Sequence, residues 1–258
     1  MRIDNQIYDR IGDGWWDEDN PLNLLQGSFT PGRFAYFRDV LERTGRDPSG
    51  RRVVDIGSGG GFLAEEFARL GCRVIGLDPS EVSVRTAVGH ANASGLDARY
   101  VVAAGERLPL ADESVDIAYC CDVLEHVSDL DHVLAETARV LKPGGLYLFD
   151  TINRTFASKV LVIKVMQEWR LTRAVDVAWH AWEMFIRPAE LADGLRRHGL
   201  RLGEITGLGV RAGKLGVLRD FMRVRRGGIS IGEFGRALDA GRVKSTRVSY
   251  MGYATKPW

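Results

Sequence analysis

Two acidic residues and a histidine, Asp122, Glu125 and His126, follow an apolar run over residues 115–121. Ligands of open α/β sheets bind beyond the carboxyl ends of such strands, so we expect these side chains at a ligand site. A carboxylate or an imidazole placed there can accept a proton from a substrate. Glu125 can alternatively serve only to fix the tautomer of His126.

A glycine-rich bend at residues 57–61 separates a strand candidate at 53–56 from a helix candidate at 62–70. Because glycine has no Cβ, such a bend brings backbone N–H groups and a helix N-terminus close to a ligand. A dinucleotide-binding fingerprint would place glycine where this chain has Phe62. The bend therefore predicts a cofactor site of another kind.

Two aspartates accompany the bend. Asp55 lies in the first strand, and we expect it to point toward the bend, where a carboxylate would repel a pyrophosphate but attract a cation. Asp78 ends the next apolar run, at the place from which a carboxylate binds ribose hydroxyls. Pro79 and Ser80 follow, and Ser80 is a suitable N-cap for a helix that runs to residue 94. Together these features predict a nucleoside cofactor that carries a positive charge.

The composition is that of a globular protein, with 258 residues, 45% hydrophobic and 27% charged. A net charge of +1 argues against a nucleic-acid partner, because proteins that bind nucleic acid normally have a basic domain. The first residues lack the plan of a signal peptide, and no apolar run is long enough to span a bilayer. Cys72, Cys120 and Cys121 are expected to be reduced, so we expect a cytoplasmic protein.

Strand and helix patterns alternate through most of the chain, which predicts an α/β, Rossmann-like fold. We expect a mostly parallel sheet of seven strands with helices on both faces and an antiparallel pair formed by the last two strands. The strands are expected at 53–56, 74–77, 99–103, 115–121, 146–151, 200–208 and 248–254. The chain is interpreted as one domain, 1–258, with a helical flap at 1–50, a cofactor-binding core at 51–154, an insertion at 155–187 and the rest of the sheet at 188–258.

Trp15 and Trp16 stand out in the flap because they lie among acidic residues and glycines. Their indoles can pack the flap onto the domain, or they can close over an apolar substrate. Further along, residues 32–44 have the periodicity of an amphipathic helix.

The insertion at 155–187 combines apolar residues and tryptophans with lysines and arginines. This pattern is typical of a helical lid, and also of a helix that lies on a membrane surface. The later segment 209–247 is rich in glycine and arginine, which predicts a solvated face or, as the less favoured alternative, contact with lipid phosphates.

The glycine bend together with Asp78 resembles motif I of class I S-adenosylmethionine-dependent methyltransferases. Over nearly its whole length the chain also resembles the ubiquinone-biosynthesis O-methyltransferases. The shared segments are Trp15-Trp16-Asp17, Val123-Leu124-Glu125-His126-Val127, Leu141-Lys142-Pro143-Gly144-Gly145, Thr151-Ile152-Asn153-Arg154 and Tyr250-Met251-Gly252-Tyr253.

The resemblance implies that S-adenosylmethionine is bound by residues at or just after the ends of the first four strands. These are Asp55, Gly57, Ser58, Gly59, Gly61, Phe62, Asp78, Pro79, Ser80, Ala104, Gly105, Glu106, Cys121 and Asp122. It also implies an apolar aromatic acceptor contacted by Trp15, Trp16, Arg33 and Asn153. A phenol titrates near ~10, so methylation of its oxygen needs a base or a metal ion.

His126 and His180 are the candidate bases, with Glu125 as a partner, and the resemblance places a histidine at position 180. The resemblance further implies a divalent ion such as Mg²⁺, for which Asp122, Glu125 and His126 are the candidate ligands. Departures from the family pattern at Thr30-Pro31-Gly32-Arg33, Ser58 and Asp122 leave the acceptor open. Alternatives are an O-, N- or C-methyltransferase of secondary metabolism and a non-catalytic module that binds the cofactor or a lipid.

Overall fold

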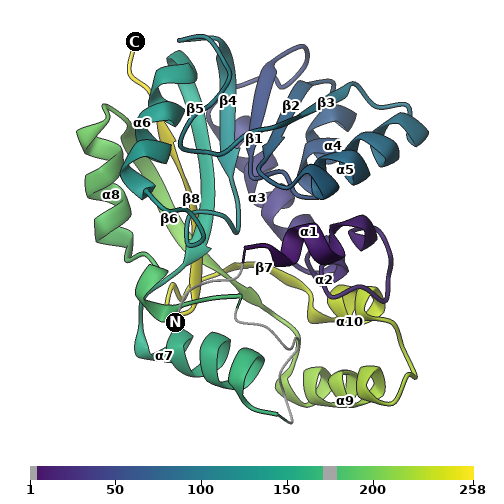
Figure 1. Ribbon diagram of the computed structural model, residues 1–258. Helices are drawn as coiled ribbons and strands as arrows, with labels where there is room; N and C mark the ends of the chain where they lie inside the picture. The colour runs from purple at the N-terminus through teal and green to yellow at the C-terminus, as the bar shows by residue number, and fades with distance from the viewer. Residues whose placement is uncertain (1–4, 171–178) are drawn as a thin grey trace.

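A computed structural model describes residues 5–170 and 179–258, which fold around one eight-stranded sheet (Figure 1). The strand order is β3-β2-β1-β4-β5-β8-β6-β7. The strands are β1 Arg52–Ile56, β2 Arg73–Asp78, β3 Ala98–Val102, β4 Val115–Cys120, β5 Leu141–Ile152, β6 Arg201–Val210, β7 Ala240–Val243 and β8 Ser249–Thr255. The first five run parallel, β8 pairs antiparallel with both β5 and β6, and β7 pairs antiparallel with β6.

The predicted α/β fold with helices on both faces is confirmed, but the count of seven strands was wrong. The extra strand, β7, comes from the segment 209–247, which we had expected to be a solvated face. It is four residues long and contains Gly241, so it is too short to show the period-two apolar pattern from which strands are predicted. β6 is therefore covered on both edges, and β7 forms the end of the sheet.

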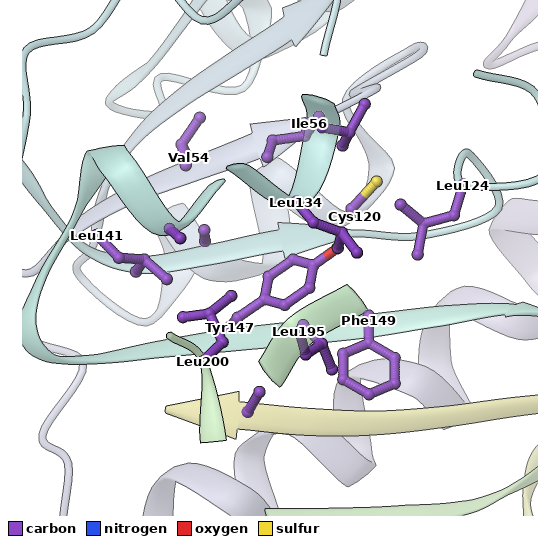
Figure 2. Packing of buried hydrophobic residues seen from close by; sticks show 14 of the residues in the cluster. Val54, Ile56, Cys120, Leu124, Leu134, Leu141, Tyr147, Phe149, Leu195 and Leu200 are labelled. Carbon is purple, nitrogen blue, oxygen red and sulfur yellow. The ribbon is translucent and has the colours of Figure 1, made fainter. Parts of the chain in front are cut away.

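Helices cover each face of the sheet. On one face, α6 (Leu130–Val140) and α8 (Pro188–Arg197) pack against side chains of β1, β4 and β5. Figure 2 shows this layer, in which Leu134 and Leu195 lie close to Tyr147 and Phe149. On the other face, α3 (Phe29–Arg43), α4 (Phe62–Arg69) and α5 (Glu81–Ala93) form a second core. Alternate residues of β1 enter the two cores, as a buried parallel strand requires.

The flap contains α1 (Ile7–Ile11), the 3₁₀ turn η1 (Gly12–Gly14) and α2 (Asn23–Gly27). It is fastened to α10 (Ile231–Leu238), which follows α9 (Lys214–Arg225) in the glycine- and arginine-rich segment. Gly232 donates its N–H to the carbonyl of Glu18, and the Glu18 carboxylate pairs with Arg236. Two segments from opposite ends of the chain thus form one layer beside the sheet (Figure 1).

The insertion begins with α7 (Phe156–Ser158) and the π-helix η2 (Lys159–Glu168) and ends with the 3₁₀ turn η3 (Trp182–Met184). Val162 and Ile163 of η2 are buried against Phe185, which fixes one side of the insertion to the domain. Within the described part of the chain, no helix is long and apolar enough to cross a membrane.

Candidate active site

The glycine bend is held against the end of β2 by its own backbone. Gly57 and Ser58 donate their N–H groups to the carbonyl of Leu77, and Gly59 donates its N–H to the Asp78 carboxylate at 2.8 Å. Gly57 and Gly59 have φ angles of 78° and 50°, in the left-handed region that glycine tolerates. A Cβ on Gly57 would lie 2.2 Å from the Val123 side chain. Glycine here lets the bend approach the segment after β4.

Asp78 ends β2 inside the site. One of its oxygens accepts from Gly59 and the other from the Ser80 N–H at 2.9 Å. A carboxylate offers about four lone-pair positions, so acceptor capacity remains for ribose hydroxyls. Burial raises the pKa of Asp78, while the two backbone donors oppose that shift. Ser80 caps α5 through the Ser83 N–H, as predicted, and the intervening Pro79 is exposed.

Asp55 lies one residue before the end of β1. Its side chain is buried within the domain, and burial raises its pKa to about 8. At neutral pH the carboxyl group is therefore mostly protonated. The expected attraction of a cation to Asp55 stays a prediction.

The two flap tryptophans pack against the glycine bend. Trp15 covers Gly59 and Gly60, at both of which a Cβ would meet its indole, and its N–H donates to Ser83 Oγ at 2.9 Å. Trp16 donates to the Gly60 carbonyl and stacks on His90 with ring centroids 3.4 Å apart. These contacts support the packing interpretation of both indoles.

Phe62 and Tyr8 complete this aromatic layer. Phe62 begins α4 directly after the left-handed Gly61, and its ring meets both tryptophans edge to face. Tyr8 lies parallel to Trp15 on one side and edge-on to His126 on the other, with 6.2 Å between ring centroids in each pair. Tyr8 was not among the predicted site residues, because a single tyrosine in a short helix forms no motif that would indicate a site.

A buried ion cluster shapes the end of β4. Asp122 has a left-handed backbone with φ 55°, and its N–H donates to Asp150 at 3.0 Å. Arg33 of α3 forms ion pairs with both Asp122 and Asp150, and the side chains of Arg33 and Asp150 are buried. The expectation that Arg33 contacts the acceptor is therefore not supported: its guanidinium is engaged by the two carboxylates, and it joins α3 to the ends of β4 and β5.

Glu125, His126 and His180 gather beyond this cluster, where one ligand atom from each lies within 4.8 Å of the others. Thr151 at the end of β5 donates to Glu125 Oε2 at 2.7 Å. Gln167 of η2 holds the backbone of His180 by two hydrogen bonds, of 2.8 and 3.0 Å. The insertion thus carries His180 to the strand ends. Asp122, a predicted metal ligand, pairs with Arg33 and is not part of this group.

Burial sets the charges of these three groups. Burial raises the pKa of Glu125 to about 8, and the nearby Asp122 contributes to the shift. Burial lowers the pKa of His126 to about 3, helped by His180, and lowers that of His180 to about 4. At neutral pH the imidazoles are therefore uncharged. Among the described residues, His126 Nδ1 and Glu125 Oε1 are buried without a hydrogen-bond partner.

Asn153 does not contact the site as we expected. Its side-chain amide donates to the Thr246 carbonyl at 2.8 Å, and its N–H donates to Val248. Arg154 pairs with Glu190 and donates to the Glu183 carbonyl. The Thr151-Ile152-Asn153-Arg154 motif therefore fixes where the chain leaves β5. Its first member, Thr151, does reach the site through its hydrogen bond to Glu125. Thr151 was not among the predicted site residues, although the motif that contains it was identified.

The segments after β3 and β4 border the site. Glu106 accepts hydrogen bonds from the N–H and hydroxyl of Ser128, so it ties these two segments together. A Cβ on Gly105 would lie 3.0 Å from Ile56, which explains the glycine between Ala104 and Glu106. Cys121 is partly buried, and all three cysteines are free, as expected.

Comparison with known proteins agrees with this geometry. A methyltransferase-domain family profile matches residues 54–149. A ubiquinone biosynthesis O-methyltransferase from Methylobacterium sp. (strain 4-46) is 39% identical over 211 residues, covering 78% of this chain and 82% of that protein. One from Sinorhizobium fredii is 38% identical over 216 residues, covering 80% and 86%. The chain belongs to the ubiquinone biosynthesis O-methyltransferase family.

As a member of that family it is an S-adenosylmethionine-dependent methyltransferase. A structure from Thermotoga maritima, described as a possible histamine N-methyltransferase, superimposes with a TM-score of 0.60 at 20% identity and covers 96% of this chain and 99% of that one. A [4+2]-cyclase gives 0.58 at 21% identity, covering 86% and 80%. Since these two neighbours differ in chemistry, the shared fold alone does not define the reaction.

The site fits S-adenosylmethionine at the positions that the structure can test. Gly57 and Gly59 let the bend pack closely on Val123 and Trp15, and the Asp78 carboxylate beside the bend retains acceptor capacity at the strand end. Asp78 would hold the ribose of the cofactor.

Proposed function

We propose that this methyltransferase acts on a phenolic or catechol hydroxyl of a quinone precursor, or of a similar aromatic compound with an apolar tail. The Glu125–His126–His180 cluster carries the proposal, since it gathers proton-accepting groups at the ligand edge of the sheet. The relatives named above act in ubiquinone biosynthesis, and they support the choice of a quinone precursor.

S-adenosylmethionine supplies a methyl group already activated on a sulfonium. The chain must then hold the acceptor oxygen in line and remove its proton. Glu125 is suited to this task because its pKa of about 8 lies near the working pH. The imidazoles of His126 and His180 accept a hydrogen bond or share the proton, while burial disfavours a lasting positive charge on either ring.

A divalent ion is the second role that we propose for the same three residues. Mg²⁺ prefers oxygen ligands, and this group offers one carboxylate and two imidazoles. The donor set therefore suits a transition-metal ion such as Mn²⁺ or Zn²⁺ better than Mg²⁺. Calorimetric titration of the chelator-treated protein with each ion separates the two roles, because a purely proton-accepting cluster would bind none of them.

The insertion at 155–187 would meet the apolar acceptor or the membrane that contains it. Phe156 is 78% exposed and Leu161 is 43% exposed, whereas Val162 and Ile163 are buried. One side of this segment thus packs on the domain, and the other side offers apolar surface. Lys159 lies over the Trp182 ring, and Lys164 pairs with Glu168. This division supports both a lid and a membrane-facing role.

Incubation with S-adenosylmethionine and a prenylated catechol tests the proposed reaction. We expect S-adenosylhomocysteine and a product heavier by one methylene unit, with the new methyl on oxygen. Methylation of nitrogen or carbon in a panel of acceptors would favour a role in secondary metabolism. Cofactor binding without any methylated product would favour a non-catalytic binding module.

A further inference from the structure

Helix α9 has an apolar stripe that faces solvent. Leu215 is 85% exposed, Leu218 is 59% exposed and Met222 is 42% exposed. Their spacing of three and four residues puts them on one side of the helix. Large apolar side chains that are exposed together in this way mark an interaction surface more often than those that are scattered singly.

The opposite side of α9 already has its partner. The ring of Phe221 packs against Phe234 of α10, with centroids 6.2 Å apart, and Val217 and Val224 are partly buried. The stripe is therefore not the core-facing side of the helix. It remains uncovered after α9 has packed on the domain.

Positive charge surrounds the stripe. Residues 211–226 contain six arginines and lysines and one acidic residue, Asp220, a net charge of +5 in a chain whose total is +1. Asp220 is shared by Arg219 and Arg223, and Arg211 pairs with Asp239. Among the described residues, Lys214, Arg225 and Arg226 have no ion-pair partner. This segment thus carries a concentrated positive charge.

The fold places α9 at the same edge of the sheet as the candidate active site. β8 runs antiparallel to both β5 and β6, so β5 and β6 end at the same edge. The carboxyl ends of the parallel strands, with Glu125 and Thr151, lie there too. α9 follows β6 and η2 follows β5, and Figure 1 shows both helices beyond this edge.

We propose that α9 docks on an anionic lipid bilayer, with Leu215, Leu218 and Met222 inserted among the headgroups and the basic side chains against lipid phosphates. An apolar stripe within a basic helix is the pattern of an interfacial helix. A second copy of the chain is disfavoured as the partner, because two faces of the same charge repel each other. This inference extends the proposed function, since an acceptor with an apolar tail would be reached from the bilayer.

Vesicle co-sedimentation tests the docking without any acceptor, so its outcome is independent of the proposed reaction. We expect the protein to bind vesicles that contain phosphatidylglycerol and not vesicles of phosphatidylcholine alone, and high salt should weaken the binding. The double variant Leu215→Ser, Leu218→Ser and the charge variant Arg225→Glu, Arg226→Glu should each reduce binding by about tenfold or more. Val102→Ser on β3, a 49% exposed residue at the other end of the sheet, is the matched control and should bind as the native chain does.

Three results would overturn the proposal. In the first, the α9 variants bind anionic vesicles with the affinity of the native chain, and the double variant Phe156→Ser, Leu161→Ser abolishes binding. Only the insertion would then meet the membrane. The native chain could fail to bind vesicles of either kind. Sedimentation velocity could show a dimer that the α9 variants dissociate, which would assign the stripe to a second copy. Unchanged affinity for S-adenosylhomocysteine establishes that each variant is folded.

Discussion

The imidazole rings of His126 and His180 lie with their centroids 5.0 Å apart, although the residues belong to different segments of the chain. His126 follows β4, and His180 is delivered by the insertion through Gln167. A half-buried pair of neutral imidazoles beside Glu125 needs the insertion for its geometry. The insertion is therefore part of the candidate active site, whatever its outer side contacts.

Removal of the Gln167 amide should displace His180. We expect Gln167→Ala to lower kcat by about tenfold, because a misplaced proton acceptor removes the proton less efficiently. The affinity for S-adenosylhomocysteine should stay unchanged. The neighbouring variant Glu168→Ala, on the exposed side of η2, is the control. Steady-state kinetics with calorimetry gives both quantities, and equal activity of the two variants would contradict the role of Gln167.

The Asp78 carboxylate should determine cofactor affinity. Asp78→Ala removes the acceptor that orders Gly59 and Ser80 and that would bind the ribose, so we expect the Kd for S-adenosylhomocysteine to rise by about 10- to 100-fold. Glu81→Ala, three residues further on and exposed, should leave the Kd unchanged. An unaltered Kd in Asp78→Ala would show that the cofactor binds elsewhere.

Much of this cofactor half could be predicted from the sequence, because the strand, glycine bend and helix follow one another and Asp78 ends the next strand. In the other half, Glu125, His126 and His180 were named from the sequence as well, but the contacts around them could not be predicted. Arg33 and Asp150 are brought together by packing between distant segments, and no local pattern reports their ion pair. Asn153 and Arg154 belong to a motif whose role proved to be structural, and β7 was too short to be detected.

The ion cluster of Arg33, Asp122 and Asp150 should be essential for stability. Arg33→Met would leave two carboxylates near each other with no cation, one of them fully buried, and should lower the free energy of unfolding by about 3–5 kcal/mol. Urea denaturation measures this change, with Arg85→Met on the exposed side of α5 as the control. An equal decrease in the free energy of unfolding in both variants would show that the ion cluster makes no specific contribution to stability.

The pH dependence of catalysis should report Glu125. Its raised pKa means that it is protonated below about pH 8 and becomes a proton acceptor above it, so kcat/KM should rise with pH through this range. His126 and His180 have lowered pKa values, so they stay neutral between pH 5 and 7. Their titration should therefore cause no change in kcat/KM over this range. Glu125→Gln should remove the rise. A native profile that is flat around pH 8 would exclude Glu125 as the group that titrates.

The most direct test of the whole account is a single-turnover experiment with S-adenosylmethionine and a prenylated catechol, followed by mass spectrometry, on the native chain and on His126→Ala. The account predicts an O-methylated catechol from the native chain. For the variant, it predicts cofactor affinity that is retained and methyl transfer slowed by about 10²-fold or more. Rapid O-methylation by the His126→Ala protein, or no product from the native chain with any catechol, would contradict it.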